Sequence, residues 1–152
     1  MAAVDDVDKL IERLRLAMDE FQKGNPKPTQ ELFSDKEDVT LANPLGPAAT
    51  GIGPVAHGWE QVSKTQEHAA STSRDGELVS VEVVERHVTP ELAYIVEIER
   101  AKAKIGGSGD ITPFALRVTM IFRPQEGTWK IVHRHADPIT TAQPAESVIQ
   151  EK

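Results

Sequence analysis

Four long segments in the second half of the chain alternate apolar and polar side chains, and this pattern constrains the fold more than any other feature. They cover residues 78–87, 93–105, 111–123 and 128–136. A period of two is that of a β-strand, whose successive side chains point to opposite faces. Short turns containing glycine or proline separate the segments, so we expect four antiparallel neighbours.

The first half of the chain is predicted to be mainly helical. Residues 4–23 carry one apolar stripe at helical spacing, and Gly24 ends it. We expect a short helix from Pro28, a short strand over residues 38–43, and a helix over residues 54–71 with Trp59 on its buried side. Helices followed by a meandering sheet predict an α+β domain with the helices on one face of a curved sheet.

Composition limits the number of domains and the partners. The 152 residues suit a single domain, which we place at residues 1–139, followed by a polar tail at 140–152. The net charge of −7 argues against nucleic acid or an anionic membrane as partner. No cysteine is present, and neither a long apolar run nor a basic leader segment is visible. We therefore expect a soluble, cytoplasmic protein.

The last alternating segment carries the most suggestive polar residues. Its alternation places Trp129, Ile131, His133, His135 and Asp137 on one face. The other face then carries the side chains between them, which are Lys130, Val132, Arg134 and Ala136. An apolar start that leads to two imidazoles and a carboxylate predicts the wall of a small-molecule pocket. A β-bulge would reverse this parity.

Further polar residues can be added to this pocket by parity. Arg117 and Thr119 share a face of their strand, and Glu99 or Arg100 could approach from the neighbouring one. Arginine suits an anionic ligand, and a histidine paired with Glu99 or Asp137 could exchange protons near neutral pH. Alternatively, the face with Arg117 and Thr119 points outward, and the apolar face meets the helices. Three further charged residues are interpreted as part of a solvated surface or of a salt-bridge network at a dimer interface: Glu97, Lys102 and Lys104.

The His-x-His motif at His133 and His135 also raises the question of a metal site. Two imidazoles on one strand face could bind zinc or iron together with Asp137 or Glu99. Arg117, on the strand expected beside them, would disfavour a cation. We therefore expect no metal.

The run Asp-Val-Thr-Leu-Ala-Asn-Pro-Leu-Gly at residues 38–46, the following helix and the closing Gly-Thr-Trp-Lys-Ile-Val-His-Arg-His-Ala-Asp-Pro together resemble the nuclear-transport-factor-2-like (NTF2-like) superfamily. Within it the chain is similar to the ketosteroid-isomerase-like and SnoaL-like branch. The resemblance implies a cone-shaped mixed sheet wrapped round the N-terminal helices, in a cystatin-like α+β barrel with an internal pocket. It also implies a homodimer formed through the sheet.

The resemblance carries catalytic residues over only in part. Ketosteroid isomerases place their aspartate base where this chain has Asn43, and an amide cannot abstract a proton. We therefore expect another isomerase or lyase that needs no cofactor, with His133, His135 and Glu99 as acid-base residues. The ligand contacts would be Arg117, Asn43, Trp59, Thr119 and Asp137.

Two alternatives to an enzyme stay open. The closing Trp-Lys-Ile-Val-His-Arg-His is similar to the association domain of calcium/calmodulin-dependent protein kinase, so the chain could be a binding or oligomerisation module. A small subunit that serves a larger enzyme is the other, because the same fold occurs in ring-hydroxylating oxygenases.

Overall fold

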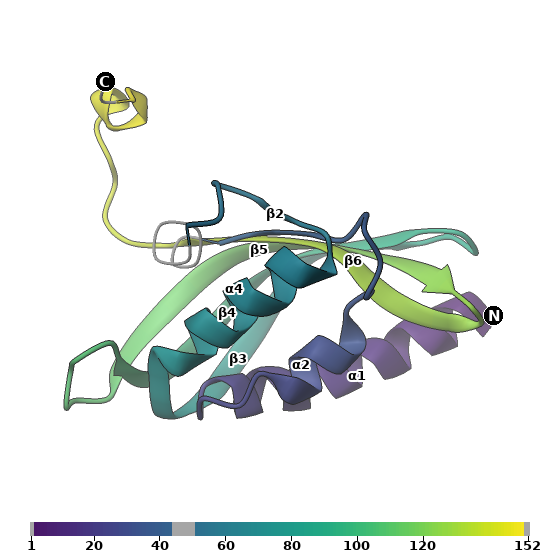
Figure 1. The fold of residues 1–152 in the computed structure, drawn as a ribbon, viewed down its shortest axis with the longest axis horizontal. Helices are drawn as coiled ribbons and strands as arrows, with labels where there is room; N and C mark the ends of the chain where they lie inside the picture. The colour runs from purple at the N-terminus through teal and green to yellow at the C-terminus, as the bar shows by residue number, and fades with distance from the viewer. Residues whose placement is uncertain (1, 44–50, 151–152) are drawn as a thin grey trace.

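The computed structural model describes residues 2–43 and 51–150, and it shows helices first and a long-stranded sheet afterwards (Figure 1). The elements are α1 (Ala2–Phe21), α2 (Lys27–Leu32), β1 (Thr40–Ala42), β2 (Ala56–His57), α4 (Trp59–Ser71), β3 (Ser73–Val88), β4 (Ala93–Ile105), β5 (Thr112–Gln125), β6 (Thr128–Pro138) and a 3₁₀ turn (Ala145–Val148). The four alternating segments are therefore strands, as predicted, and the α+β class is confirmed.

The sheet has six strands in the order β2-β1-β6-β5-β4-β3. Strands β3 to β6 form an antiparallel meander, whereas β1 runs parallel to β6. Within the described residues β2 and β3 are the two edges and do not pair, so this mixed sheet is open and does not close into a barrel.

One face of the sheet, called here the inner face, packs on the helices. Alternation along β4 decides which side chains it receives, and they are Ala93, Ile95, Glu97, Glu99, Ala101 and Ala103, all buried. The apolar stripe of α1 covers this face with Val7, Leu10, Leu14, Ala17 and Met18. Burying both stripes removes apolar surface from water, which is the main force that holds helix and sheet together.

Helix α4 is shorter than the sequence suggested. Gly58 has φ 85°, a conformation that L side chains rarely adopt, and α4 starts only after it. The two preceding residues, Ala56 and His57, pair with β1 instead of adding a helical turn. As a result Val55 is exposed, although the predicted helix would have placed it on the buried side.

A bulge in β6 corrects the predicted face assignment of this strand. Ile121 of β5 pairs with His133, while the next residue, Phe122, pairs with Ile131, so Val132 is an extra residue in β6. The inner side chains of β6 are Trp129 and Ile131 before the bulge and Arg134 and Ala136 after it. His133, His135 and Asp137 consequently lie on the opposite face from Trp129 and Ile131.

The tail beyond β6 is exposed from Ile139 to the last described residue. Figure 1 shows it leaving the body of the domain on the side away from α1 and α2. The division into a domain at residues 1–139 and a tail at 140–152 stays a prediction. None of the helices in the described part of the chain has the length and apolar character needed to cross a membrane.

Candidate functional site

Four charged side chains form a chain of ion pairs on the inner face. Arg15 of α1 donates two hydrogen bonds to Glu97, at 2.7 and 2.8 Å. Arg134 of β6 donates two to Glu99, at 2.7 and 2.8 Å. The two glutamates lie two residues apart on β4, which brings their carboxyl groups to the same side of one strand. Both glutamate side chains are almost completely shielded from water, at 0% and 5% exposure.

Each member of this cluster is positioned by a different element. The parity of β4 turns Glu97 and Glu99 inward together with Ile95 and Ala101. The bulge at Val132 turns Arg134 inward beside Glu99. Arg15 reaches Glu97 from the edge of the apolar stripe of α1, next to Leu14. The arrangement therefore depends on one helix and two strands that are distant in sequence.

The pKa values of the two glutamates move in opposite directions. Burial raises the pKa of Glu97 to about 7, and the hydrogen bonds from Arg15 only partly offset this, while Glu99 raises it further. Burial also acts on Glu99, but the charge of Arg134 and its hydrogen bonds outweigh burial and lower the pKa of Glu99 below its ordinary value. Near neutral pH, Glu97 therefore carries a proton in a large share of molecules while Glu99 is ionised.

Further polar groups lie buried in the helix layer without a hydrogen-bond partner among the described residues. They are the amide oxygen and nitrogen of Gln66, the hydroxyl of Thr65 and the amide oxygen of Gln22. Thr65 and Gln66 belong to the buried side of α4, which also includes Val62 and Ala69. Unsatisfied buried polar groups are rare in stable proteins, because each costs the free energy of a lost hydrogen bond.

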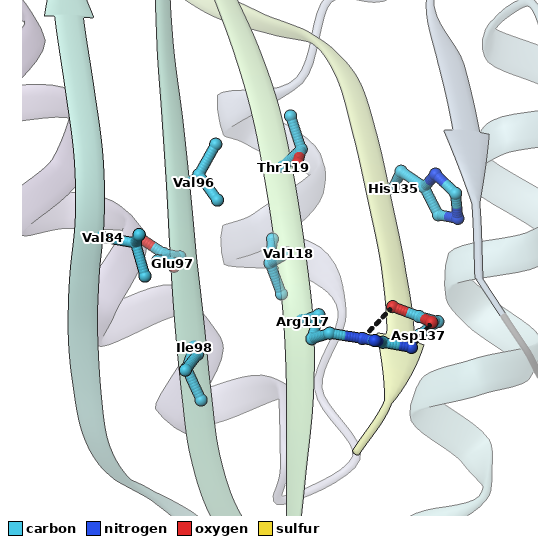
Figure 2. Close-up of a pocket in the computed structure, with 9 residues that line it drawn as sticks. All are labelled: Val84, Val96, Glu97, Ile98, Arg117, Val118, Thr119, His135 and Asp137. Carbon is cyan, nitrogen blue, oxygen red and sulfur yellow. Dashed lines mark hydrogen bonds and ion pairs between the residues drawn. The ribbon is translucent and has the colours of Figure 1, made fainter. Parts of the chain in front are cut away.

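The residues predicted as a pocket lie on the other side of the sheet, called here the outer face. Figure 2 looks onto this face and shows a shallow depression lined by Val84, Val96, Ile98, Arg117, Thr119, His135 and Asp137. Val118 and Glu97, whose side chains are buried, also border it. Its volume is about 430 Å³. Arg117 donates to Asp137 at 2.5 and 3.2 Å, and His133 Nδ1 lies 2.7 Å from the hydroxyl of Thr40.

Most of the predicted site residues thus separate into two groups on opposite faces of the sheet. Arg117, Thr119, His135 and Asp137 meet on the outer face, with His133 beside them. Glu99 lies on the inner face and pairs with Arg134, not with a histidine. The interpretation of Glu97 as solvent-facing is wrong, because its exposure is 1%. Lys102 and Lys104 do lie on the outer face, in ion pairs with β3.

Asn43 and Trp59 are placed apart from both groups. Asn43 follows the last residue of β1 and is half-buried. Trp59 is the first residue of α4, packs against the core and borders a second depression beside Phe33 and Lys130. Neither lines the depression that holds Arg117.

Sequence reasoning missed Arg15, Glu97 and Arg134 as members of a buried site. A signal for Glu97 was present, because it shares its parity with Ile95, Ala101 and Ala103, which are typical core residues. Nothing comparable marks Arg134, whose direction depends on the bulge at Val132. The described residues contain no group of three or more His, Asp or Glu side chains arranged to hold a metal ion.

Comparison with known families agrees with this architecture. The profile of the SnoaL-like domain matches residues 31–140, which is most of the chain. The chain belongs to the SnoaL-like family. The SnoaL-like match begins in α2 and ends just after β6, so it includes the whole sheet with Glu97, Glu99 and Arg134.

Several solved structures share the fold of this SnoaL-like chain. A proposed dehydratase of the NTF2-like family from Streptomyces avermitilis has a TM-score of 0.69 and 17% identity, covering 92% of this chain and 99% of its own. A ketosteroid isomerase-like protein from Erwinia carotovora atroseptica has a TM-score of 0.69 and 16% identity, and the alignment covers 90% of this chain and 96% of that protein. A proposed calcium/calmodulin-dependent protein kinase II association domain from Xanthomonas campestris has a TM-score of 0.65 and 18% identity, and the alignment covers 90% of this chain and 87% of that protein.

At these identities the structural similarity establishes the fold alone. Together with the SnoaL-like match, this shared fold confirms the resemblance to the NTF2-like superfamily and its SnoaL-like and ketosteroid-isomerase-like branch. No curated protein matches the sequence.

Proposed function

We propose that this SnoaL-like protein binds a small organic molecule on the inner face of its sheet and acts on it by acid-base chemistry, as an isomerase or lyase. The observation that carries the proposal is the pair of neighbouring buried carboxyl groups whose pKa values are driven in opposite directions. Environments that separate two carboxyl pKa values in this way are typical of acid and base partners in active sites.

The two glutamates would have different roles. Glu99 is ionised and can accept a proton, for example from a carbon next to a carbonyl group. Glu97, with a pKa of about 7, can donate a proton at neutral pH. In a dehydration, the electron pair of the broken C–H bond forms the C=C bond, the C–O bond breaks, and the proton from Glu97 converts the leaving hydroxide into water. In an isomerisation, the same pair would move a proton between two carbons.

The arginines would hold this pair in its working state. Arg134 keeps Glu99 ionised through its charge and two hydrogen bonds. Arg15 fixes the position of Glu97 from α1. The Streptomyces avermitilis neighbour, itself a proposed dehydratase, supports a lyase reaction as one of the two options. His133 and His135, on the outer face, have no role in this chemistry.

Carbon-13 NMR of the glutamate carboxyl groups tests the proposal directly. We expect Glu97 to titrate near pH 7 and Glu99 below the ordinary glutamate value, with assignments from Glu97→Gln and Glu99→Gln. The wild type is then incubated in D₂O with enolisable ketones and β-hydroxy acids, and deuterium incorporation or loss of water is followed by proton NMR. Glu77→Gln, on an exposed residue of β3, is the matched control. Two ordinary titrations, or activity that survives Glu97→Gln, would contradict the proposal.

A second candidate is a binding or oligomerisation module without catalysis. It is favoured by the bidentate pairing of both carboxylates, because arginine occupies both oxygens of Glu97 and both oxygens of Glu99. Such pairs also occur as purely structural elements. The fold shared with the Xanthomonas campestris association domain is consistent with it. In this case Glu97→Gln and Glu99→Gln would change stability, and no compound of the panel would be converted.

A further inference from the structure

A second depression lies where α1, α2, the start of α4 and the hairpin between β5 and β6 meet. Its volume is about 600 Å³, which is enough for a small organic ligand. It shares no lining residue with the depression on the outer face, and neither Glu97 nor Glu99 lines it. This second depression is therefore a separate candidate site.

Two aromatic side chains form the apolar part of the second depression. Phe33 is 2% exposed and belongs to the core, whereas Trp59 is half-buried. Trp59 packs against the core and also lines the depression. An indole ring in this position offers a flat apolar surface on which another planar ring can stack.

Hydrogen bonds between separate elements hold the walls of the second depression together. Lys130 Nζ of β6 donates to the backbone carbonyl oxygen of Glu31 in α2 at 2.7 Å. Gln30 Nε2 of α2 donates to the backbone carbonyl oxygen of Ser63 in α4 at 3.3 Å. Because α2, α4 and β6 are joined in this way, a ligand would find the site already formed, which lowers the entropic cost of binding.

The charges of the second depression leave one cation and one anion unpaired. The lining contains three of each sign, which are Arg13, Lys36, Lys130, Glu31, Asp35 and Glu126. Lys36 lies 3.1 Å from Glu126 and 3.7 Å from Asp35. Among the described residues, the guanidinium of Arg13 and the carboxylate of Glu31 pair neither with each other nor with any other charged group. Both are thus available to a ligand.

These two groups favour a ligand that carries both charges. The planar fork of Arg13 suits a carboxylate, and the carboxylate of Glu31 can accept hydrogen bonds from an ammonium group. A ligand with one charge of each sign has no net charge, so the −7 of the chain does not repel it. A simple anion would be repelled.

We propose that the second depression binds a zwitterionic aromatic molecule, of which an aromatic amino acid, free or in a short peptide, is the simplest example. The carboxylate contacts Arg13, the ammonium group contacts Glu31, and the aromatic ring stacks on Trp59. This binding goes beyond the proposed acid-base function and does not depend on Glu97 or Glu99.

An NMR titration of the full chain at pH 7.5 tests the proposal. The chain has two tryptophans, so Trp59→Phe assigns both indole N–H signals. L-Phenylalanine and glycyl-L-phenylalanine present the two charges at different spacings, and we expect at least one of them to shift the Trp59 signal. The Trp129 signal should stay in place, because that side chain is buried and does not line the depression.

Phenylpropionate and phenylethylamine each keep the ring and only one of the charges. We expect both to bind about tenfold more weakly than the better zwitterion, because each loses one charge-assisted hydrogen-bonded contact. A Trp59 signal that none of the four compounds shifts would overturn the proposal. Equal affinity for either singly charged compound would overturn it as well.

Charge-removing variants locate the site. Arg13→Gln and Glu31→Gln, both at exposed positions, should each weaken binding of the zwitterion by about tenfold. Lys64→Gln on α4 and Glu12→Gln on α1 remove the same charges at exposed positions outside the depression, and should bind like the wild type. Affinities that are unchanged in Arg13→Gln and Glu31→Gln would contradict the proposed contacts.

Discussion

Both faces of the sheet carry an arginine–carboxylate pair, and the two pairs differ in how much water reaches them. The difference shows that exposure to solvent, more than contact distance, decides the electrostatic effect of such a pair. On the inner face, Arg134 and Glu99 have side-chain exposures of 17% and 5%. On the outer face, Arg117 and Asp137 have 66% and 44%. Both pairs are bidentate and short. Water therefore screens the outer pair more strongly than the inner one.

The contact distance of an arginine–carboxylate pair and its contribution to stability are separate quantities. A short distance between an arginine and a carboxylate says little about stability when water surrounds both groups. A buried pair costs much desolvation free energy, so losing one partner leaves an uncompensated charge in the core. The same burial that makes the inner pair costly also shifts the pKa values of Glu97 and Glu99, which is why the acid-base proposal rests on this face.

Removing Arg134 should have the largest effect. We expect Arg134→Leu to lower the free energy of unfolding by about 3–5 kcal/mol, because it leaves Glu99 charged and buried without a partner. Urea denaturation at pH 7.5 measures it. Replacing both partners, in Arg134→Leu/Glu99→Leu, should recover most of this loss. A double variant no more stable than Arg134→Leu would show that packing, not the orphaned charge, is responsible.

The second largest effect should be a change in the free energy of unfolding with pH, caused by Glu97. Its pKa lies at about 7 in the folded protein against an ordinary value of 4.5, so the folded state holds a proton that the unfolded state has released. The wild type therefore becomes less stable as the pH rises from about 4.5 to about 7, by at most ~3–4 kcal/mol. Glu97→Gln removes this dependence, and urea denaturation at pH 5 and pH 8 measures the difference.

Glu77→Gln on the outer face is the control for this pH experiment, since Glu77 is exposed and paired with Lys102. It should change with pH in parallel with the wild type. Parallel pH curves for the wild type and Glu97→Gln would mean that Glu97 titrates as an ordinary surface glutamate, and the acid-base proposal would fail with it.

The next effect concerns the buried amide of Gln66, whose oxygen and nitrogen have no hydrogen-bond partner among the described residues. Gln66→Met replaces an amide that has no partner among the described residues with an apolar side chain of similar size. We expect the free energy of unfolding to rise by about 1 kcal/mol. A loss of that size would instead show that the amide is already satisfied by bound water or ligand.

The smallest effect is expected on the outer face. Arg117→Leu should change the free energy of unfolding of the monomer by less than about 1 kcal/mol, because the pair with Asp137 is exposed and screened. Urea denaturation at pH 7.5 measures it. An effect as large as that of Arg134→Leu would abolish the distinction between the two faces.

Much of the fold could be predicted from the sequence because its determinants are local. Strand β4 starts and ends where the alternation does, at Ala93 and Ile105, and the apolar stripe of residues 4–23 became α1. Arg117 and Thr119 were correctly assigned to one face, with Leu116 and Val118 on the other. The candidate site was harder to predict from the sequence, because parity assigns residues to faces without saying which face the helices cover.

Two errors in the predicted site, the face assignment of β6 and the exposure of Glu97, have specific causes. The bulge at Val132 reversed the parity of β6, so His133 and His135 moved to the outer face and Arg134 moved to the core. Glu97 was assigned to solvent because a lone glutamate is rarely buried. In the structure Arg15, 82 positions away in the chain, binds it, and no local pattern marks such a distant partner.

The periods, turns and apolar stripes of the sequence were sufficient to predict the α+β class, and the resemblance of residues 38–46 and of the closing strand pointed to the SnoaL-like branch. Only the tertiary structure decided that Glu97 and Glu99 meet two arginines in the core while the two histidines face outward. The physical reason is that a period of two defines two faces equally well. The choice between them, and every pKa that follows from it, depends on which face the helices exclude from water.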